Sequence, residues 1–162
     1  MMIAHSRLIK KWGRYNNAIN TKGENMIDEF NGITYLVIFI IHFAGYAFYA
    51  FRCVLSTKAF VDQYGMGDGA AIMTRFLGGI FVGSVLMALN IMFIRSEGLE
   101  GSWAFFNLIF LQNLCVFLVS LFANRQGSLG TNEKTSIEGY IAPGVLTLLS
   151  ALLCYGLADK IY

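Results

Sequence analysis

The sequence has few charged residues and one proline, and this composition argues against an ordinary soluble domain and against a nucleic-acid-binding protein. Charged residues make up 14% of its 162 positions, against about 25% in an ordinary soluble domain. The net charge of +2 is too small to indicate a nucleic-acid partner. The single proline, Pro143, falls in the first turn of an expected helix, where its missing N–H costs nothing. A composition that is 56% hydrophobic with 17 glycines therefore favours an integral membrane protein.

Motifs for metal binding and catalysis are also missing. The three cysteines, Cys53, Cys115 and Cys154, lie far apart in or beside apolar runs and form no C-x-x-C pair, so we interpret them as buried apolar side chains. The sequence has no nucleophile–base arrangement, no paired intramembrane carboxylates, no phosphate-binding glycine loop and no H-E-x-x-H motif. We therefore expect a protein that is not an enzyme and that requires no metal or cofactor.

Long apolar runs dominate what remains. The run from Ala70 to Ile94 carries one charge, Arg75, and is long enough to cross a bilayer as a helix. Similar runs complete a set of four predicted helices, at residues 33–55, 70–94, 103–122 and 139–158. Short loops between them predict an all-α integral membrane protein, in which residues 32–162 form a four-helix transmembrane bundle of up-down-up-down order.

Small residues recur along the predicted helix at residues 70–94. Gly79 and Gly83 lie four positions apart, and Ser84 and Ala88 follow about one turn on. Such spacing opens a flat groove that lets another helix approach closely, which is how helices associate in lipid. We expect Gly79, Gly83 and Ala88 to mark the packing centre of the bundle.

The N-terminal segment, residues 1–31, is polar but patterned. Apolar residues recur at helical spacing, namely Leu8, Ile9, Trp12, Tyr15 and Ile19. Four basic residues occupy the other side of the same predicted helix, namely Arg7, Lys10, Lys11 and Arg14. This pattern predicts an amphipathic helix on an anionic membrane surface, followed by a linker. The alternative is a mobile cytosolic tail. Basic residues are also more numerous on the side of the termini, which predicts that both termini are cytoplasmic, or face the organellar equivalent.

One histidine, His42, lies within the first predicted helix, with Tyr46 and Tyr49 on the same face. Lipid cannot satisfy such a polar stripe, so it must face protein or a cofactor. A neutral imidazole is a good axial ligand, so His42 is a candidate ligand for haem iron or chlorophyll magnesium. The alternative is a hydrogen bond from His42 to a neighbouring helix.

Further polar residues lie within the other predicted helices, namely Arg75, Asn90, Asn107, Gln112 and Asn113. The amides either make hydrogen bonds between helices or, with His42 and the two tyrosines, line a central pocket. Arg75 lies near a helix end, so it can pair with Asp62, Asp68 or a lipid phosphate. The alternative role of Arg75 is to hold an anionic substrate or a quinone headgroup.

Two short runs carry a family resemblance. The run FVDQYG at residues 60–65, followed by RFLGG at residues 75–79 at the start of an apolar helix, is similar to small four-helix bacterial membrane proteins of the DoxX-like kind. Those proteins usually have a proline after the first helix, where this chain has Ser56, Thr57 and Lys58. The resemblance covers about a quarter of the chain. It implies a four-helix fold, and no catalytic residue is carried over from it.

Two functions fit this pattern. The first is a non-catalytic accessory subunit of a larger membrane complex, of respiratory, photosynthetic or monooxygenase type, which contacts other transmembrane subunits, lipids or pigments. The second is an independent small transporter, channel or redox-linked membrane protein with a polar pocket inside the bundle. The two differ in whether the polar residues converge on one interior space.

Overall fold

The computed structural model describes residues 26–127 and 137–162, and the regular structure in these residues is helical. The predicted surface helix and linker lie mostly outside them. The four long helices are α2 (Ile33–Val54), α4 (Ala71–Phe93), α5 (Trp103–Gln126) and α6 (Glu138–Gly156). Three short helices join or extend them: α3 (Thr57–Gln63), the 3-10 turn η1 (Asp68–Ala70) and α7 (Ala158–Ile161).

Each of the four long helices is long and apolar enough to cross a membrane. The 23 residues of α4, for example, span about 35 Å at 1.5 Å per residue, which exceeds the roughly 30 Å of a hydrocarbon core. Large apolar side chains such as Leu55, Val119 and Leu148 are exposed on the outer faces, where lipid can cover them. The prediction of a multi-pass helical membrane bundle is confirmed.

The helix ends follow local chemistry and differ slightly from the predicted ones. After α2, Thr57 Oγ1 donates to the carbonyls of Cys53 and Val54, at 2.7 and 3.1 Å, which occupies carbonyls left free at the helix end. α5 continues four residues past the predicted end, to Gln126, and stops where Gly127 adopts a left-handed conformation with φ of 54°. α6 begins at Glu138, so Pro143 lies in its second turn, not its first as predicted, and removes one backbone hydrogen bond there.

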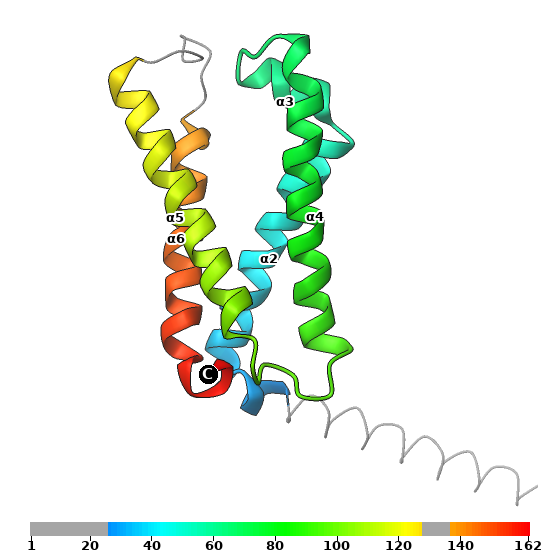
Figure 1. Cartoon of the computed structure of the whole chain (residues 1–162), viewed down its shortest axis with the longest axis vertical. Coiled ribbons are helices and arrows are strands. Elements are labelled where there is room, and N and C mark those ends of the chain that lie inside the picture. The colour runs from blue at the N-terminus through cyan, green and yellow to red at the C-terminus, as the bar shows by residue number, and fades with distance from the viewer. Residues whose placement is uncertain (1–25, 128–136) are drawn as a thin grey trace, which may run out of the picture.

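The helices form two pairs that diverge towards one end (Figure 1). α2 packs along α4, α5 packs along α6, and a smaller contact between α2 and α6 joins the pairs. The end where the pairs meet holds residues 26–32, the loop at residues 94–102 and the C-terminus, and we call it the closed end. The other end, with α3, the C-terminal end of α5 and the start of α6, is the open end.

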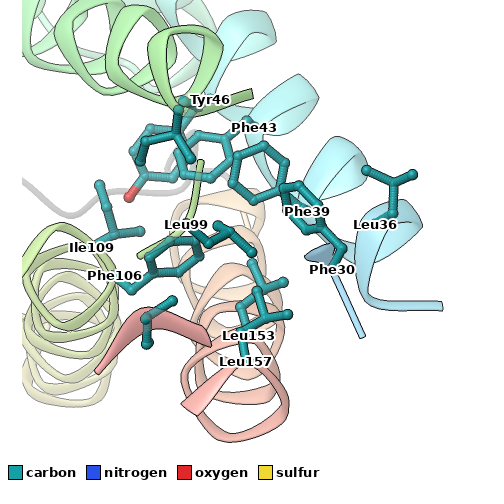
Figure 2. Close-up of a cluster of buried hydrophobic side chains, with 13 residues drawn as sticks. Phe30, Leu36, Phe39, Phe43, Tyr46, Leu99, Phe106, Ile109, Leu153 and Leu157 are labelled. Carbon is teal, nitrogen blue, oxygen red and sulfur yellow. The ribbon is translucent and has the colours of Figure 1, made fainter. Parts of the chain in front are cut away.

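The apolar core lies at the closed end. Buried side chains from all four long helices meet there, and include Phe39, Ile91, Phe106 and Leu153; Figure 2 shows this cluster. Two polar contacts hold the chain segments around this core. Glu29 Oε1 accepts from the Leu99 N–H at 2.8 Å, and Asn31 Nδ2 donates to the Gly156 carbonyl at 2.9 Å. The closed end is therefore fixed by packing and by hydrogen bonds together.

The packing face of α4 is not the predicted one. Gly79 and Gly83 lie on the outer face, where an added Cβ would meet nothing within 4 Å. Gly78 instead faces α2, where an added Cβ would lie 2.6 Å from Val54 Cγ2 and 2.8 Å from Cys53 Cβ. Ala88 is buried, as expected. The prediction that Gly79 and Gly83 pack within the bundle is wrong, because both lie on the face of α4 turned away from α2.

Candidate intramembrane binding cleft

A cavity of about 620 Å³ occupies the space between the two helix pairs, towards the open end. Aromatic side chains make up much of its wall: Tyr46, Tyr49, Phe60, Tyr64, Phe81 and Tyr140. The remaining wall residues are mostly apolar or small, with Gln112, Asn113, Ser120, Asn124 and Glu138 as the polar ones. We call this cavity the cleft.

Asn113 forms a polar network at the inner end of the cleft. Its Oδ1 accepts from the Tyr46 hydroxyl at 2.8 Å, and its Nδ2 lies 3.1 Å from His42 Nε2. The same Nδ2 lies 3.3 Å from Ser150 Oγ and 3.4 Å from the Leu146 carbonyl. Asn113 thus connects α5 to both α2 and α6.

These contacts determine the hydrogen-bond roles at His42. A backbone carbonyl can only accept, so the atom of Asn113 that faces Leu146 must be the amide nitrogen. That nitrogen then donates to His42 Nε2, which leaves the proton of a neutral imidazole on Nδ1. The Leu146 backbone lies near the imidazole, but Nδ1 has no hydrogen-bond partner of good geometry in the described residues.

His42 has no exposed surface and packs between aromatic rings. Its ring stacks on Tyr46 with centroids 5.0 Å apart and meets Phe43 edge-on at 4.8 Å. It does not line the cleft. A haem or chlorophyll ligand needs a nitrogen that faces the pigment, and this geometry does not fit one. His42 instead makes the interhelical hydrogen bond that was the alternative interpretation.

A second network closes part of the open end. Glu138, at the start of α6, accepts from Arg52 Nη1 at 2.6 Å and from the Tyr49 hydroxyl at 2.5 Å through Oε1. Its Oε2 accepts from Gln63 Nε2 at 2.8 Å, and Gln63 in turn accepts from Arg52. These four residues, which we call the open-end network, join α2 and α3 to α6 where the helix pairs are otherwise apart.

Aromatic side chains surround the open-end network: two phenylalanine rings contact its guanidinium group, and a nearby tyrosine stays uncharged beside its carboxylate. The guanidinium of Arg52 lies 4.9 Å from the ring centroid of Phe60 and 5.4 Å from that of Phe48, which is cation–π geometry. Burial, with the nearby Glu138 carboxylate adding to it, raises the pKa of Tyr64 to about 12. The Tyr64 phenol therefore stays neutral at physiological pH.

The structure brings together four of the polar residues that the sequence indicated, because Tyr46, Tyr49, Gln112 and Asn113 all line the cleft. His42 lies directly behind Tyr46 and Asn113.

Three other candidates lie outside the cleft. Arg75 is exposed and forms no ion pair within the described residues, and its two expected partners, Asp62 and Asp68, both pair with Lys58. Asn107 Nδ2 donates to the Tyr162 hydroxyl at 2.8 Å, at the closed end. Asn90 lies half-buried near the end of α4. These three residues do not share one space with the others.

The sequence interpretation did not select Arg52, Gln63 and Glu138 for the site. A signal was present for two of them, because Arg52 and Glu138 carry opposite charges at the ends of two predicted helices on the same side of the membrane. Pairing across these helix ends satisfies both charges where water is scarce. No sequence signal indicates Gln63, which lies between the first two predicted membrane-spanning helices.

Comparisons of the chain with protein-family models, with curated proteins and with solved structures find no match.

Proposed function

We propose that this protein binds a lipid-soluble small molecule in the cleft and carries or presents it within the bilayer. The observation that carries the proposal is an open cavity of about 620 Å³ between membrane-spanning helices, with amide and aromatic side chains in its wall. Ligand pockets in proteins are commonly of about 300–1,000 Å³ and are mostly apolar with a few polar groups. Nothing in this cleft resembles a nucleophile with its base, so binding without chemistry fits it best.

The rim of the cleft supports entry from the lipid. Leu77 and Ile80 on α4 and Val116 on α5 line the cleft and are also substantially exposed. All three lie well inside the candidate spans, and α4 and α5 have little contact with each other. A molecule dissolved in the bilayer can therefore reach the cleft sideways, between these two helices.

Native mass spectrometry of the protein purified in a mild detergent tests the proposal. A molecule that co-purifies should appear as an added mass, and Val116→Trp should remove it by filling the cleft. Val119→Trp is the matched control, because Val119 lies on the same helix, is 66% exposed and does not line the cleft. Retention of the added mass in Val116→Trp, or its equal loss in both variants, would contradict the proposal.

We also propose that the protein acts as an accessory subunit in a larger membrane assembly. Gly79 and Gly83 support this role, because both lie on the outer face of α4 with nothing within 4 Å of an added Cβ. Such a surface suits a closely packed helix from another subunit. Native gel electrophoresis of gently solubilised membranes tests it: co-migration with a large complex is expected, and migration near 18 kDa would contradict it.

For orientation, we propose that both termini face the cytoplasm or its organellar equivalent. The described ends of the chain and the loop at residues 94–102 lie together at the closed end. The basic residues that the sequence carries in the two terminal segments and in this loop are therefore counted on one side of the membrane, and the positive-inside rule assigns the side with more of them to the cytoplasm. The open end of the cleft then faces the opposite compartment. Labelling of a Tyr162→Cys variant by a membrane-impermeant maleimide in sealed vesicles of known orientation distinguishes the two orientations.

A further inference from the structure

We infer that the ligand of the cleft is an uncharged molecule with a planar ring and a carbonyl or hydroxyl group, and that this group meets Gln112 about halfway across the membrane. The inference rests on the proposed binding function and names the chemistry of its ligand. Three observations carry it, namely the charge of the wall, the state of Gln112 and the aromatic lining.

The described part of the cleft wall offers no free charge. Among the lining residues that the structure describes, the one carboxylate is Glu138, and there is no lysine or arginine. Glu138 is already bound to Arg52, Tyr49 and Gln63. A charged group buried without a partner at membrane depth is strongly unfavourable. An anionic or zwitterionic lipid headgroup would find no counter-ion inside, so the ligand should be neutral.

Gln112 is the wall residue nearest mid-membrane whose polar side chain makes no hydrogen bond in the described residues; Ser120 and Asn124, which also make none, lie nearer the open end. Gln112 lies nine residues after Trp103, about 14 Å along α5 at 1.5 Å per residue, and it lines the cleft. Within residues 26–127 and 137–162 its amide makes no hydrogen bond, whereas its neighbour Asn113 is bonded through both amide atoms. An amide at this depth needs a partner, because lipid supplies none. A ligand carbonyl or hydroxyl in the cleft would satisfy it.

The aromatic lining indicates a ring. Tyr46 and Phe81 meet edge-on with centroids 5.1 Å apart, and Tyr49 lies 6.1 Å from Phe81. The hydroxyls of both tyrosines are already donated to Asn113 and Glu138. What these side chains still offer a ligand is ring faces and edges, which pair best with another planar ring.

Photo-crosslinking with three benzophenone probes tests the inference. Benzophenone itself has planar rings and a carbonyl, and the three probes share one alkyl chain but end in a methyl ester, a carboxylate or a quaternary ammonium. After irradiation of the protein in vesicles, peptide mass spectrometry locates the adducts. We expect the neutral probe to label residues around Gln112 at a concentration at least tenfold lower than either charged probe. Labelling of outer lipid-facing residues serves as the internal reference.

Two variants of Gln112 sharpen this test. Gln112→Leu should reduce labelling of the inner cleft by the neutral probe several-fold, and Gln112→Glu should shift the preference towards the cationic probe. Asn107→Leu is the matched control, because Asn107 lies on the same helix and does not line the cleft. It should leave labelling near Gln112 unchanged.

The outcomes separate the two proposals. Saturable labelling of the cleft by all three probes alike, or labelling that does not respond to either Gln112 variant, would overturn the inference and leave the binding function standing. If none of the probes labels the cleft above the outer-face reference, both the binding function and the inference fail.

Discussion

Nδ2 of Asn113 lies 3.1 Å from Nε2 of His42, and this contact joins α5 to α2 in the middle of the bundle. Both side chains are buried, at 5% and 0% exposure. The same amide also binds Tyr46 and approaches Ser150, so one asparagine links three of the four spanning helices. Because lipid competes poorly for such groups, this network should specify how the two helix pairs meet.

The hydrogen bond between Tyr46 and Asn113 should contribute measurably to stability. We expect Tyr46→Phe and Asn113→Leu each to destabilise the protein, with a coupling energy of about 0.6–1.7 kcal/mol in a double-mutant cycle. Reversible unfolding in mixed detergent micelles measures the four free energies. Tyr155→Phe is the control, because Tyr155 is 84% exposed and should change nothing. Additive effects of the two substitutions would mean that the hydrogen bond does not stabilise the fold.

Two adjacent glycines on α4 should respond in opposite ways to the same substitution. Gly78→Ala places a methyl group against Val54 and Cys53, and overpacking of this kind costs about 1–3 kcal/mol. Gly79→Ala meets open space and should be neutral, or stabilising by up to about 1 kcal/mol through helix propensity. Thermal unfolding in detergent compares them. Equal melting temperatures for the two variants would contradict the observed packing face of α4.

The contrast between these glycines shows what the sequence could predict. Length and apolarity predict the four spans, because any helix that crosses the bilayer must satisfy both. The sequence does not say which face of such a helix meets its neighbours, since α4 is apolar nearly all round. Gly79 and Gly83 matched the small-residue pattern, but Gly78 makes the contact.

For the polar residues, too, the sequence predicts burial but does not identify the partners. The preference of amides for partners at membrane depth predicts that Asn113 is buried and bonded, but not that its partners are His42 and Tyr46. Gln112 and Asn113 are neighbours in sequence and both line the cleft, yet in the described residues only Asn113 is hydrogen-bonded, because a step of about 100° around the helix turns its amide towards α2 and α6. The cleft itself arises from the divergence of the helix pairs, and no local pattern encodes that angle.

The open-end network should hold the helix pairs together. Glu138→Gln removes the ion pair with Arg52, whose side chain is 15% exposed, and we expect a loss of about 1–3 kcal/mol. The control is Lys58→Gln at the same end, where the Lys58–Asp62 pair is 75% and 57% exposed and should contribute little. Thermal unfolding measures both variants. A loss in Lys58→Gln as large as that in Glu138→Gln would show that the network has no special role.

Cys115 is a native reporter of ligand in the cleft. It lines the cleft and is exposed, whereas Cys53 is fully buried and Cys154 is half-buried and outside the cleft. A saturating amount of the neutral methyl-ester benzophenone probe, without irradiation, should slow alkylation of Cys115 by N-ethylmaleimide several-fold and leave Cys154 unchanged. Peptide mass spectrometry over a time course gives both rates in one sample. Val116→Trp should slow Cys115 alkylation without any ligand, because its indole fills the same space. If the probe slows both cysteines alike, it acts on the micelle or on the whole fold, and the cleft is not its binding site.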